Sequence, residues 1–405
     1  MERYCSDFIY KDLKKKMVFL GGPRQVGKAT LSKKISEKYF TGGVYLNWDS
    51  DLNRKDILQQ RWLDTAPLVI FDELHKYHHW KRWIKGVYDT RPDNQTYLVT
   101  GSARLDLYRR GGDSLMGRYH YWRLHPITLD ERPLEISPKE CLQRLLTFGG
   151  FPEPFLGKDE REAKRWRRER FDRIIKEDIR DLEAIRNLSL LSLFIDSLRE
   201  RVSGLITLSN IAEDLQISPK TAKNWLSLIE RMYIAFSIYP FSKQIPRSIQ
   251  KPPKVFFYDN ADVIDQSGAR LENLVATHLL KRLHFLEDYQ GSRCSLHYIR
   301  DKDGREVDFV TQVDGKVIDL IEVKAKDGDV SSSLKYYAEL LKPARAVQIV
   351  EIYIVPFTQK EFSSQTPSIF LCTLLGKEFF KKQTIISSEK LKFERYGLGC
   401  DALLQ

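Results

Sequence analysis

The sequence lacks the features that mark secreted and membrane-spanning proteins. No apolar run approaches the roughly 18 to 20 residues needed to cross a bilayer, and the charged opening segment, MERYCSDFIYKDLKKK, contains no apolar signal core. The five cysteines are far apart and form no CxxC pair, which excludes a zinc ribbon and a disulfide scaffold. We therefore expect a cytoplasmic chain in a reducing compartment, without a membrane partner.

The composition is that of a packed globular protein with a basic excess. With 405 residues, 42% of them hydrophobic and 30% charged, the chain is long enough for two or three domains. Lys and Arg outnumber Asp and Glu by 66 to 55, and six basic residues against two acidic ones lie within 161–170. This excess fits a polyanionic partner such as a nucleic acid, but the run at 161–170 also fits a solvated helix face or a linker.

The first third alternates strands with helices. Four short apolar segments are separated by helix-sized stretches, which predicts a parallel sheet covered by helices on both faces, and hence an α/β fold. The four predicted strands are 17–20, 44–48, 68–71 and 97–100.

The middle of the chain reads as helical and contains a helix-turn-helix pattern. Ser209 is expected to cap the first helix and Ser218 the second, with Pro219 at its first position. The following YIAFSIYPF alternates like a strand and is a candidate wing. The next loop is basic and suits a phosphate backbone, although a winged helix used only for packing explains the same pattern. The basic residues of that loop are Lys243, Arg247, Lys251 and Lys254.

A phosphate-binding loop is the strongest motif. Gly22, Gly27 and Lys28 have the G-x4-G-K spacing, in which main-chain N–H groups surround the phosphates and the lysine reaches the β and γ oxygens. A predicted strand precedes the loop and a helix follows it, so we expect ATP to bind here. The expected binding residues are Gly22, Pro23, Arg24, Gln25, Val26, Gly27, Lys28, Ala29 and Thr30.

Acidic residues end the third predicted strand, LVIFDE. We expect Asp72 to hold Mg²⁺ and Glu73 to orient or deprotonate the water that attacks the γ phosphate. Thr100 and Ser102 follow the fourth strand and are candidates to sense that phosphate, although a simple polar turn is an alternative. The histidines after Glu73 are read as surface residues on a helix.

One residue departs from the phosphate-loop pattern. Ala29 follows Lys28 where such loops carry the Ser or Thr hydroxyl that ligates Mg²⁺. Thr30 comes next but points about 100° away on a helix and cannot replace it. We therefore expect nucleotide binding to survive and hydrolysis to be weak.

A second acidic group lies in the last third. GREVDFV and IEVK place Asp308, Glu322 and Lys324 on two strands of one hairpin, where two carboxylates can hold a metal ion beside a phosphodiester. A two-residue Asp314-Gly315 turn would send Glu322 to the face opposite Asp308, whereas a three-residue loop would place them diagonally together. Charged residues on a solvated hairpin face are the alternative.

Together these motifs resemble a family of prokaryotic AAA-type ATPases whose uncharacterised C-terminal half combines a winged helix with a PD-(D/E)XK nuclease-like fold. The motifs span about residues 20 to 325. They are GPRQVGKAT, LVIFDELHK, VTGSARLDL, DSLMGRY, FGGFPE, IIKEDIRDL, GARLENLVA, GREVDFV and IEVK.

The resemblance implies ATP and Mg²⁺ as cofactors and adds two residues. Glu272 would join Asp308 and Glu322 as a metal ligand, with Lys324 catalytic beside them. Arg118 would approach the γ phosphate of its own or a neighbouring subunit, so a homo-oligomer is open. The implied division is 1–135 for the AAA-type domain, 136–188 for a helical connecting or lid region, 189–254 for the winged helix-turn-helix and 255–405 for the nuclease-like domain.

Three functions are consistent with these features. The first is a weak ATPase that couples nucleotide state to a DNA-directed C-terminal half. The second is a nucleotide-gated switch or scaffold that does not hydrolyse ATP. The third is a metal-dependent DNA nuclease controlled by ATP.

Overall fold

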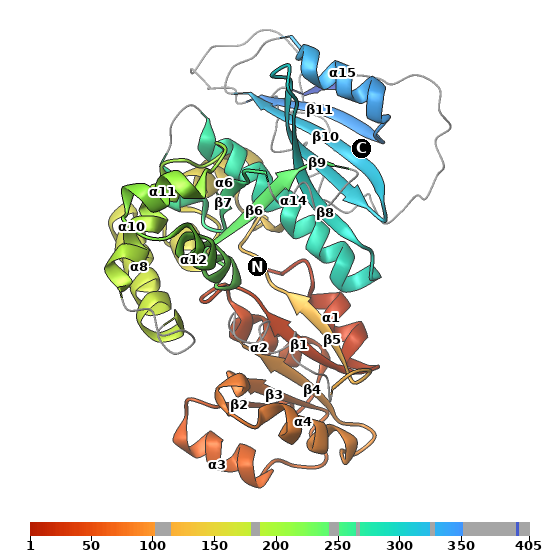
Figure 1. Cartoon of the computed structure of the whole chain (residues 1–405). Helices are drawn as coiled ribbons and strands as arrows, with labels where there is room; N and C mark the ends of the chain where they lie inside the picture. Colours follow the sequence, from red (N-terminus) through yellow and green to blue (C-terminus); the bar gives the residue numbers. More distant parts are fainter. Residues whose placement is uncertain are drawn as a thin grey trace.

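The computed structural model describes residues 1–101, 115–179, 187–242, 251–264, 268–324, 329–350 and 394–396. A parallel sheet lies at one end of the molecule, a helical region beside its centre and a second sheet at the other end (Figure 1). The predicted α/β class is confirmed. Among the described residues, no helix has the length and apolar character to cross a bilayer.

The N-terminal sheet has the strand order β2-β3-β4-β1-β5, and every neighbouring pair is parallel. Four of the strands match the predicted segments, and β5 is a fifth that the sequence did not indicate. The strands are β1 (Met17–Gly21), β2 (Val44–Asn47), β3 (Leu68–Asp72), β4 (Thr96–Thr100) and β5 (Tyr119–Arg123).

Helices cover both faces of this sheet, as expected. Because side chains alternate along a strand, Phe19 of β1 packs in one core while Val18 and Leu20 pack in the other. The first core includes side chains of α4, and the second includes side chains of α1 and α2. The helices of this region are α1 (Ser6–Leu13), α2 (Lys28–Tyr39), α3 (Asp51–Gln59), the 3₁₀ helix η1 (Leu74–Lys76) and α4 (Trp80–Asp89).

The middle region is helical. It contains η2 (Leu129–Glu131), α6 (Pro138–Phe148), α7 (Pro152–Gly157), α8 (Glu160–Arg173), the π-helix η3 (Ile174–Ile179), α10 (Leu188–Arg199), α11 (Leu208–Asp214) and α12 (Pro219–Arg231). The predicted cap of α12 is confirmed, because Ser218 accepts from the N–H of Thr221. The predicted cap of α11 is wrong. That helix begins at Leu208, so Ser209 is already inside it.

The second sheet joins the candidate wing to the C-terminal part. Its order is β12-β11-β10-β9-β8-β6-β7, with β6 antiparallel to β7 and parallel to β8 over two residue pairs. Lys254 is the first residue of β7, so the predicted boundary after 254 falls within this strand. The elements are β6 (Ala235–Pro240), β7 (Lys254–Phe257), η4 (Asn260–Asp262), α14 (Ala269–Gln290), β8 (Cys294–Arg300), β9 (Glu306–Val313), β10 (Lys316–Lys324), α15 (Ser332–Leu341), β11 (Arg345–Val350) and β12 (Glu394–Tyr396).

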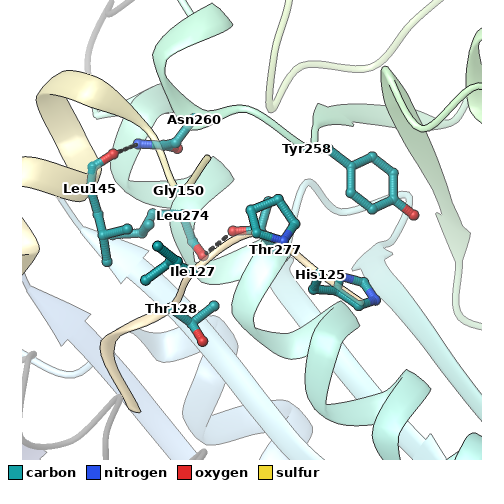
Figure 2. Close-up of a pocket in the computed structure, with 10 residues that line it drawn as sticks. His125, Ile127, Thr128, Leu145, Gly150, Tyr258, Asn260, Leu274 and Thr277 are labelled. Atoms are coloured by element: carbon teal, nitrogen blue, oxygen red, sulfur yellow. Dashed lines mark hydrogen bonds between the residues drawn. The ribbon is translucent and has the colours of Figure 1, made fainter. Parts of the chain in front are cut away.

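The FGGFPE motif lies where the three regions meet (Figure 2). Ile127 donates its N–H to the carbonyl of Gly150 at 2.6 Å, and a Cβ on Gly150 would lie 2.5 Å from the Ile127 oxygen. Gly149 has φ +78°, and a Cβ there would collide with Asp259. The enclosed space at this junction is only about 10 Å³, too small for a ligand larger than water. The glycines therefore serve close packing.

Candidate functional site: the phosphate loop and the C-terminal carboxylates

The phosphate loop connects β1 to α2 at the carboxyl edge of the N-terminal sheet. Gly22, Gln25 and Gly27 have φ values of +131°, +63° and +96°, so the chain turns sharply three times before the helix begins at Lys28. A Cβ on Gly22 would lie 2.4 Å from the carbonyl oxygen of Leu124, which leaves glycine as the residue that fits. The predicted order of strand, tight loop and helix is therefore present, and phosphate binding by the loop stays a prediction.

Lys28 folds back over the loop. Its ammonium group donates to the carbonyl oxygens of Gly22 at 3.0 Å and Pro23 at 2.7 Å, and the residue is buried. Both partners are neutral carbonyls, whereas phosphate oxygens are charged and form stronger hydrogen bonds with an ammonium group. The lysine is therefore positioned to exchange these partners for phosphates.

The predicted acidic residues lie beside the loop. Asp72 pairs with Thr100 in the parallel register of β3 and β4, and Thr100 pairs with Leu20 of β1 just before the loop. The hydroxyls of Tyr45 and Thr100 each donate to one oxygen of the Asp72 carboxylate. Thr100 thus orients Asp72, and Ser102 lies outside the described residues.

Glu73 is largely buried beside the phosphate loop. It has φ +57°, its side chain is about one-fifth exposed, and its N–H donates to the carbonyl of Thr100. Burial raises the pKa of Glu73 above its ordinary value, and Lys28 opposes that shift. The prediction that the following histidines lie at the surface is wrong for His75, which is buried with Nε2 3.6 Å from Glu73 because the chain forms a 3₁₀ turn there.

Two residues limit the fit of Mg²⁺ to this site. Ala29 supplies no hydroxyl in the first turn of α2, and Thr30 is exposed, in agreement with the expectation that it cannot substitute. Asp72 and Glu73 supply oxygens of the type that Mg²⁺ prefers. The protein residues present would therefore hold the ion with one ligand fewer than phosphate loops ordinarily supply.

Arg118 is not near the phosphate loop of its own chain. In the parallel register of β1 and β5, Met17 lies opposite Tyr119 and Gly21 opposite Arg123. The loop follows Gly21, whereas Arg118 precedes β5, so the two lie at opposite edges, about 16 Å apart along the strand. Arg118 instead pairs with Asp89 at 2.7 Å. The role within its own subunit is wrong, and contact with a neighbouring subunit stays a prediction.

The C-terminal hairpin brings Asp308 and Glu322 together by a route that the sequence did not indicate. The turn at Asp314-Gly315 has two residues, with φ values of +48° and +81°, so the expected need for a three-residue loop is wrong. An irregularity between Val317 and Asp319 instead shifts the register by one residue. Continuing that register beyond the Ile321–Phe309 pair sets Glu322 opposite Asp308, on one face of the sheet.

Lys254 lies among carboxylates of this site. Its ammonium nitrogen is 2.7 Å from Glu306, 3.3 Å from Glu272 and 3.4 Å from Asp308. Burial alone would lower the pKa of Lys254, but these carboxylates outweigh burial and raise it above its ordinary value. The expected phosphate-contacting role of Lys254 is therefore wrong, because its side chain is only 3% exposed. Lys243 and Arg247 of the same loop lie outside the described residues.

The other members of the predicted site also have protein partners. Lys324 pairs with Glu322, and Glu322 accepts from the hydroxyl of Ser331, the N-cap residue of α15. Asp308 accepts from the N–H of Val323 at 2.8 Å. In the part of the chain that the structure describes, no three His, Cys, Asp or Glu side chains are arranged to hold a metal ion. The predicted metal ligands are neighbours, yet they are not assembled around a common empty position.

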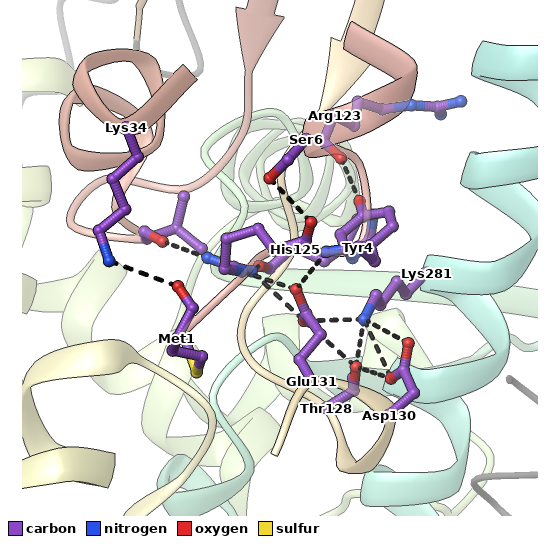
Figure 3. Close-up of polar contacts among 12 residues, drawn as sticks. Met1, Tyr4, Ser6, Lys34, Arg123, His125, Thr128, Asp130, Glu131 and Lys281 are labelled. Atoms are coloured by element: carbon purple, nitrogen blue, oxygen red, sulfur yellow. Dashed lines mark hydrogen bonds and ion pairs between the residues drawn. The ribbon is translucent and has the colours of Figure 1, made fainter. Parts of the chain in front are cut away.

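A cluster of buried polar side chains joins the phosphate loop to α14 (Figure 3). Arg3 donates to the carbonyl of Val26 at 3.0 Å and to Glu131 at 2.7 Å, and Glu131 accepts from Lys281 of α14 at 2.8 Å. Burial would raise the pKa of Glu131, but Arg3 and Lys281 lower it to about 2. We call Arg3, Glu131 and Lys281 the bridging triad. Sequence reasoning missed it because its members are 128 and 150 residues apart.

A second contact joins the same two regions. Arg123, the last residue of β5, pairs with Glu287 at 2.6 Å and Asp288 at 2.8 Å, near the end of α14. The rings of His125 and His284 are also in contact, with Nε2 and Nδ1 2.8 Å apart. The helix that carries Glu272 is therefore held along its second half by the N-terminal domain.

Three family models match successive parts of the chain. Residues 14–132 match the AAA domain. The chain therefore carries an AAA-type P-loop ATPase domain. Residues 139–266 match a domain of unknown function, DUF8612, and residues 267–373 match another, DUF4143. These descriptions assign no activity to the region beyond the AAA domain.

Two uncharacterised proteins are similar to this chain at low identity. An uncharacterised protein of Methanocaldococcus jannaschii is 24% identical over 399 residues, which is 89% of this chain and 86% of that protein. An uncharacterised protein of Mycobacterium tuberculosis is 21% identical over 243 residues, covering 60% of this chain and 54% of that protein.

Solved structures show only a distant likeness. The Thermotoga maritima RuvB Holliday junction branch migration motor matches 57% of this chain and 86% of its own at 17% identity and a TM-score of 0.29. Bacteroides Pif1 bound to ssDNA matches 38% of this chain and 48% of its own at 13% identity and a TM-score of 0.21. Scores of this size do not establish a common architecture.

Proposed function

We propose that the protein binds ATP in the loop at 22–30, hydrolyses it slowly, and couples its nucleotide state to a DNA-directed C-terminal half. The observation that carries the proposal is the meeting of Lys28, Asp72 and Glu73 at the carboxyl edge of the parallel sheet. This arrangement can neutralise phosphate oxygens and place a carboxylate beside an attacking water molecule.

The chain's own residues supply the steps of this proposal. The N–H groups of the loop and the ammonium group of Lys28 bind the phosphates, which requires Lys28 to leave the carbonyls of Gly22 and Pro23. Glu73 accepts a proton from the attacking water, and its raised pKa suits a base that works near neutral pH. Mg²⁺, when bound, neutralises phosphate charge, and Ala29 makes its retention weak.

Coupling has a physical route through the bridging triad. Arg3 bonds to the loop at Val26, and a Cβ on Gly27 would lie 3.8 Å from its Nη1, so movement of the loop changes the position of Arg3. Glu131 passes that displacement to Lys281 on α14. Because coupling is reciprocal, a ligand of the C-terminal half should alter the affinity for ATP.

The DNA-directed role is supported by exposed basic side chains. Lys220 and Lys223 lie one turn apart on α12, the second helix of the helix-turn-helix pattern. A second basic surface lies on α8. Its exposed basic residues include Arg161, Lys164, Arg165 and Arg168. Binding through these groups should weaken steeply with salt, because each phosphate contact releases a condensed counterion.

The test is ATP binding and steady-state turnover on one preparation, with and without Mg²⁺, for the native chain, Glu73→Gln and Ala29→Thr. We expect Glu73→Gln to reduce turnover by about 100-fold at unchanged affinity, and Ala29→Thr to increase it. Glu37→Gln, an exposed carboxylate on α2, is the matched control. Turnover that is unchanged in Glu73→Gln would contradict the proposal.

Two further functions are each favoured by one observation. Ala29 favours a nucleotide-gated switch, which predicts tight binding without turnover in the native chain and turnover in Ala29→Thr. The pairing of Asp308 with Glu322 favours a metal-dependent nuclease. In that case purified protein nicks DNA with Mg²⁺ or Mn²⁺, and Asp308→Asn does not.

A further inference from the structure

The carboxylates of the C-terminal site already have a cation. Lys254 enters from β7, which pairs with β6 of the candidate wing, while Glu272 belongs to α14 and both Glu306 and Asp308 to β9. The ammonium nitrogen lies within 3.4 Å of an oxygen of each, and the lysine side chain is almost fully buried. An ammonium group held by three carboxylates at these distances takes the place that a metal ion would need.

The surrounding charges support this view. Glu306 also lies 3.8 Å from Arg300, and Glu322 pairs with Lys324, so every carboxylate of the site has a cationic partner from the chain. A divalent ion that entered would have to displace Lys254, because like charges this close repel strongly in a buried site. Burying the displaced ammonium group elsewhere without a partner would add a further cost.

We propose that the ammonium group of Lys254 is the resident cation of this site, and that a divalent metal ion binds at Asp308 only when Lys254 is withdrawn. The strand that carries Lys254 pairs with β6, which pairs with β8 over two residue pairs, and it is also held to α14, because Asn273 bonds to the N–H and the carbonyl of Phe257. This inference is independent of ATP hydrolysis.

The test is calorimetric titration of Mn²⁺ into the nucleotide-free protein, compared among four variants. Native protein and Lys254→Arg should show no binding that depends on Asp308. Lys254→Met should gain one Mn²⁺ site, at least tenfold tighter than any in the native chain, and Lys254→Met/Asp308→Asn should lose it. Lys251→Met, which removes an exposed lysine three residues away, should match the native protein.

A second readout covers the case in which Lys254→Met folds poorly. Mn²⁺ should raise the midpoint of thermal unfolding of Lys254→Met and leave that of the native protein unchanged, because a ligand stabilises only the state that binds it. Two results would overturn the proposal: Mn²⁺ binding to native protein that Asp308→Asn abolishes, or a folded Lys254→Met that gains no site. Neither result bears on ATP turnover, so each is separable from the proposed ATPase activity.

Discussion

The two candidate sites of this protein each contain a buried lysine in the place where a ligand would bind, but the partners differ. Lys28 in the phosphate loop contacts two neutral carbonyls, whereas Lys254 in the C-terminal site contacts three carboxylates. A phosphate can replace carbonyls at a gain in electrostatic energy, while a metal ion must compete with an existing ion pair. The first site is therefore ready for its ligand, and the second is internally neutralised.

The largest effect expected from this difference is on stability. Lys254→Met leaves three carboxylates without their cation and should lower the free energy of unfolding by about 3–5 kcal/mol in metal-free buffer. Urea denaturation at neutral pH measures the change, with Lys251→Met as the control. A loss below about 1 kcal/mol would show that the carboxylates do not depend on Lys254.

The connection between the sites gives a pH-dependent prediction. The pKa of Glu131 is about 2 in the folded protein and near 4.5 when unfolded. Its contribution to the free energy of unfolding is therefore present above pH 4.5 and lost as the pH falls towards 2. Over that interval, the free energy of unfolding of the native chain should fall by about 3 kcal/mol more than that of Glu131→Gln. Urea denaturation across the range is the measurement, and Glu135→Gln, which removes an exposed carboxylate, should follow the native curve.

A change in ligand affinity distinguishes Lys28 from Lys254. Lys28→Ala removes two or more charge-assisted contacts to phosphate and should weaken ATP binding by about 100-fold. Equilibrium binding of a fluorescent ATP analogue gives the affinity, and Lys55→Ala on α3 is the control. An unaltered affinity would mean that the nucleotide does not bind in this loop.

The smallest expected effect concerns Arg118. Because it forms a partly exposed ion pair with Asp89 at the far edge of the sheet, Arg118→Ala should cost no more than about 1 kcal/mol of stability and leave ATP affinity unchanged. The remaining role is contact with the nucleotide of a neighbouring subunit. ATP turnover measured over a dilution series of the native chain and the variant tests it. Turnover lost only at concentrations where the protein self-associates would place Arg118 against a neighbouring subunit.

The phosphate loop was predictable because its information is local. Spacing, the preceding strand and the following helix all lie within about 25 residues, and parallel strands bring Asp72 and Thr100 to the same edge by topology alone. Arg118 was misplaced because β5 was not recognised in the sequence. Without that strand, nothing indicated which edge of the sheet Arg118 would occupy.

The C-terminal site was only partly predictable, for a different reason. Asp308 and Glu322 were identified, but their pairing depends on an irregularity between Val317 and Asp319, where the intervening residue is Ile318 and not a glycine. Lys254 was assigned to a phosphate-binding loop because its neighbours are basic. Its actual partners lie 18 to 54 residues further along the chain, and a single sequence does not report contacts at that range.

The length and stiffness of α14 determine how movement at one of its ends affects the other. The helix runs for 22 residues without interruption, with Glu272 near its first turn and Asp288 near its last, about 24 Å apart. Asp288 is fixed to β5 by Arg123, and the helix is stiff over this length. A tilt of about 5° at that end would displace Glu272 by about 2 Å, given the helical rise. Such a displacement would be passed on to β7, because Asn273, next to Glu272, bonds to both the N–H and the carbonyl of Phe257.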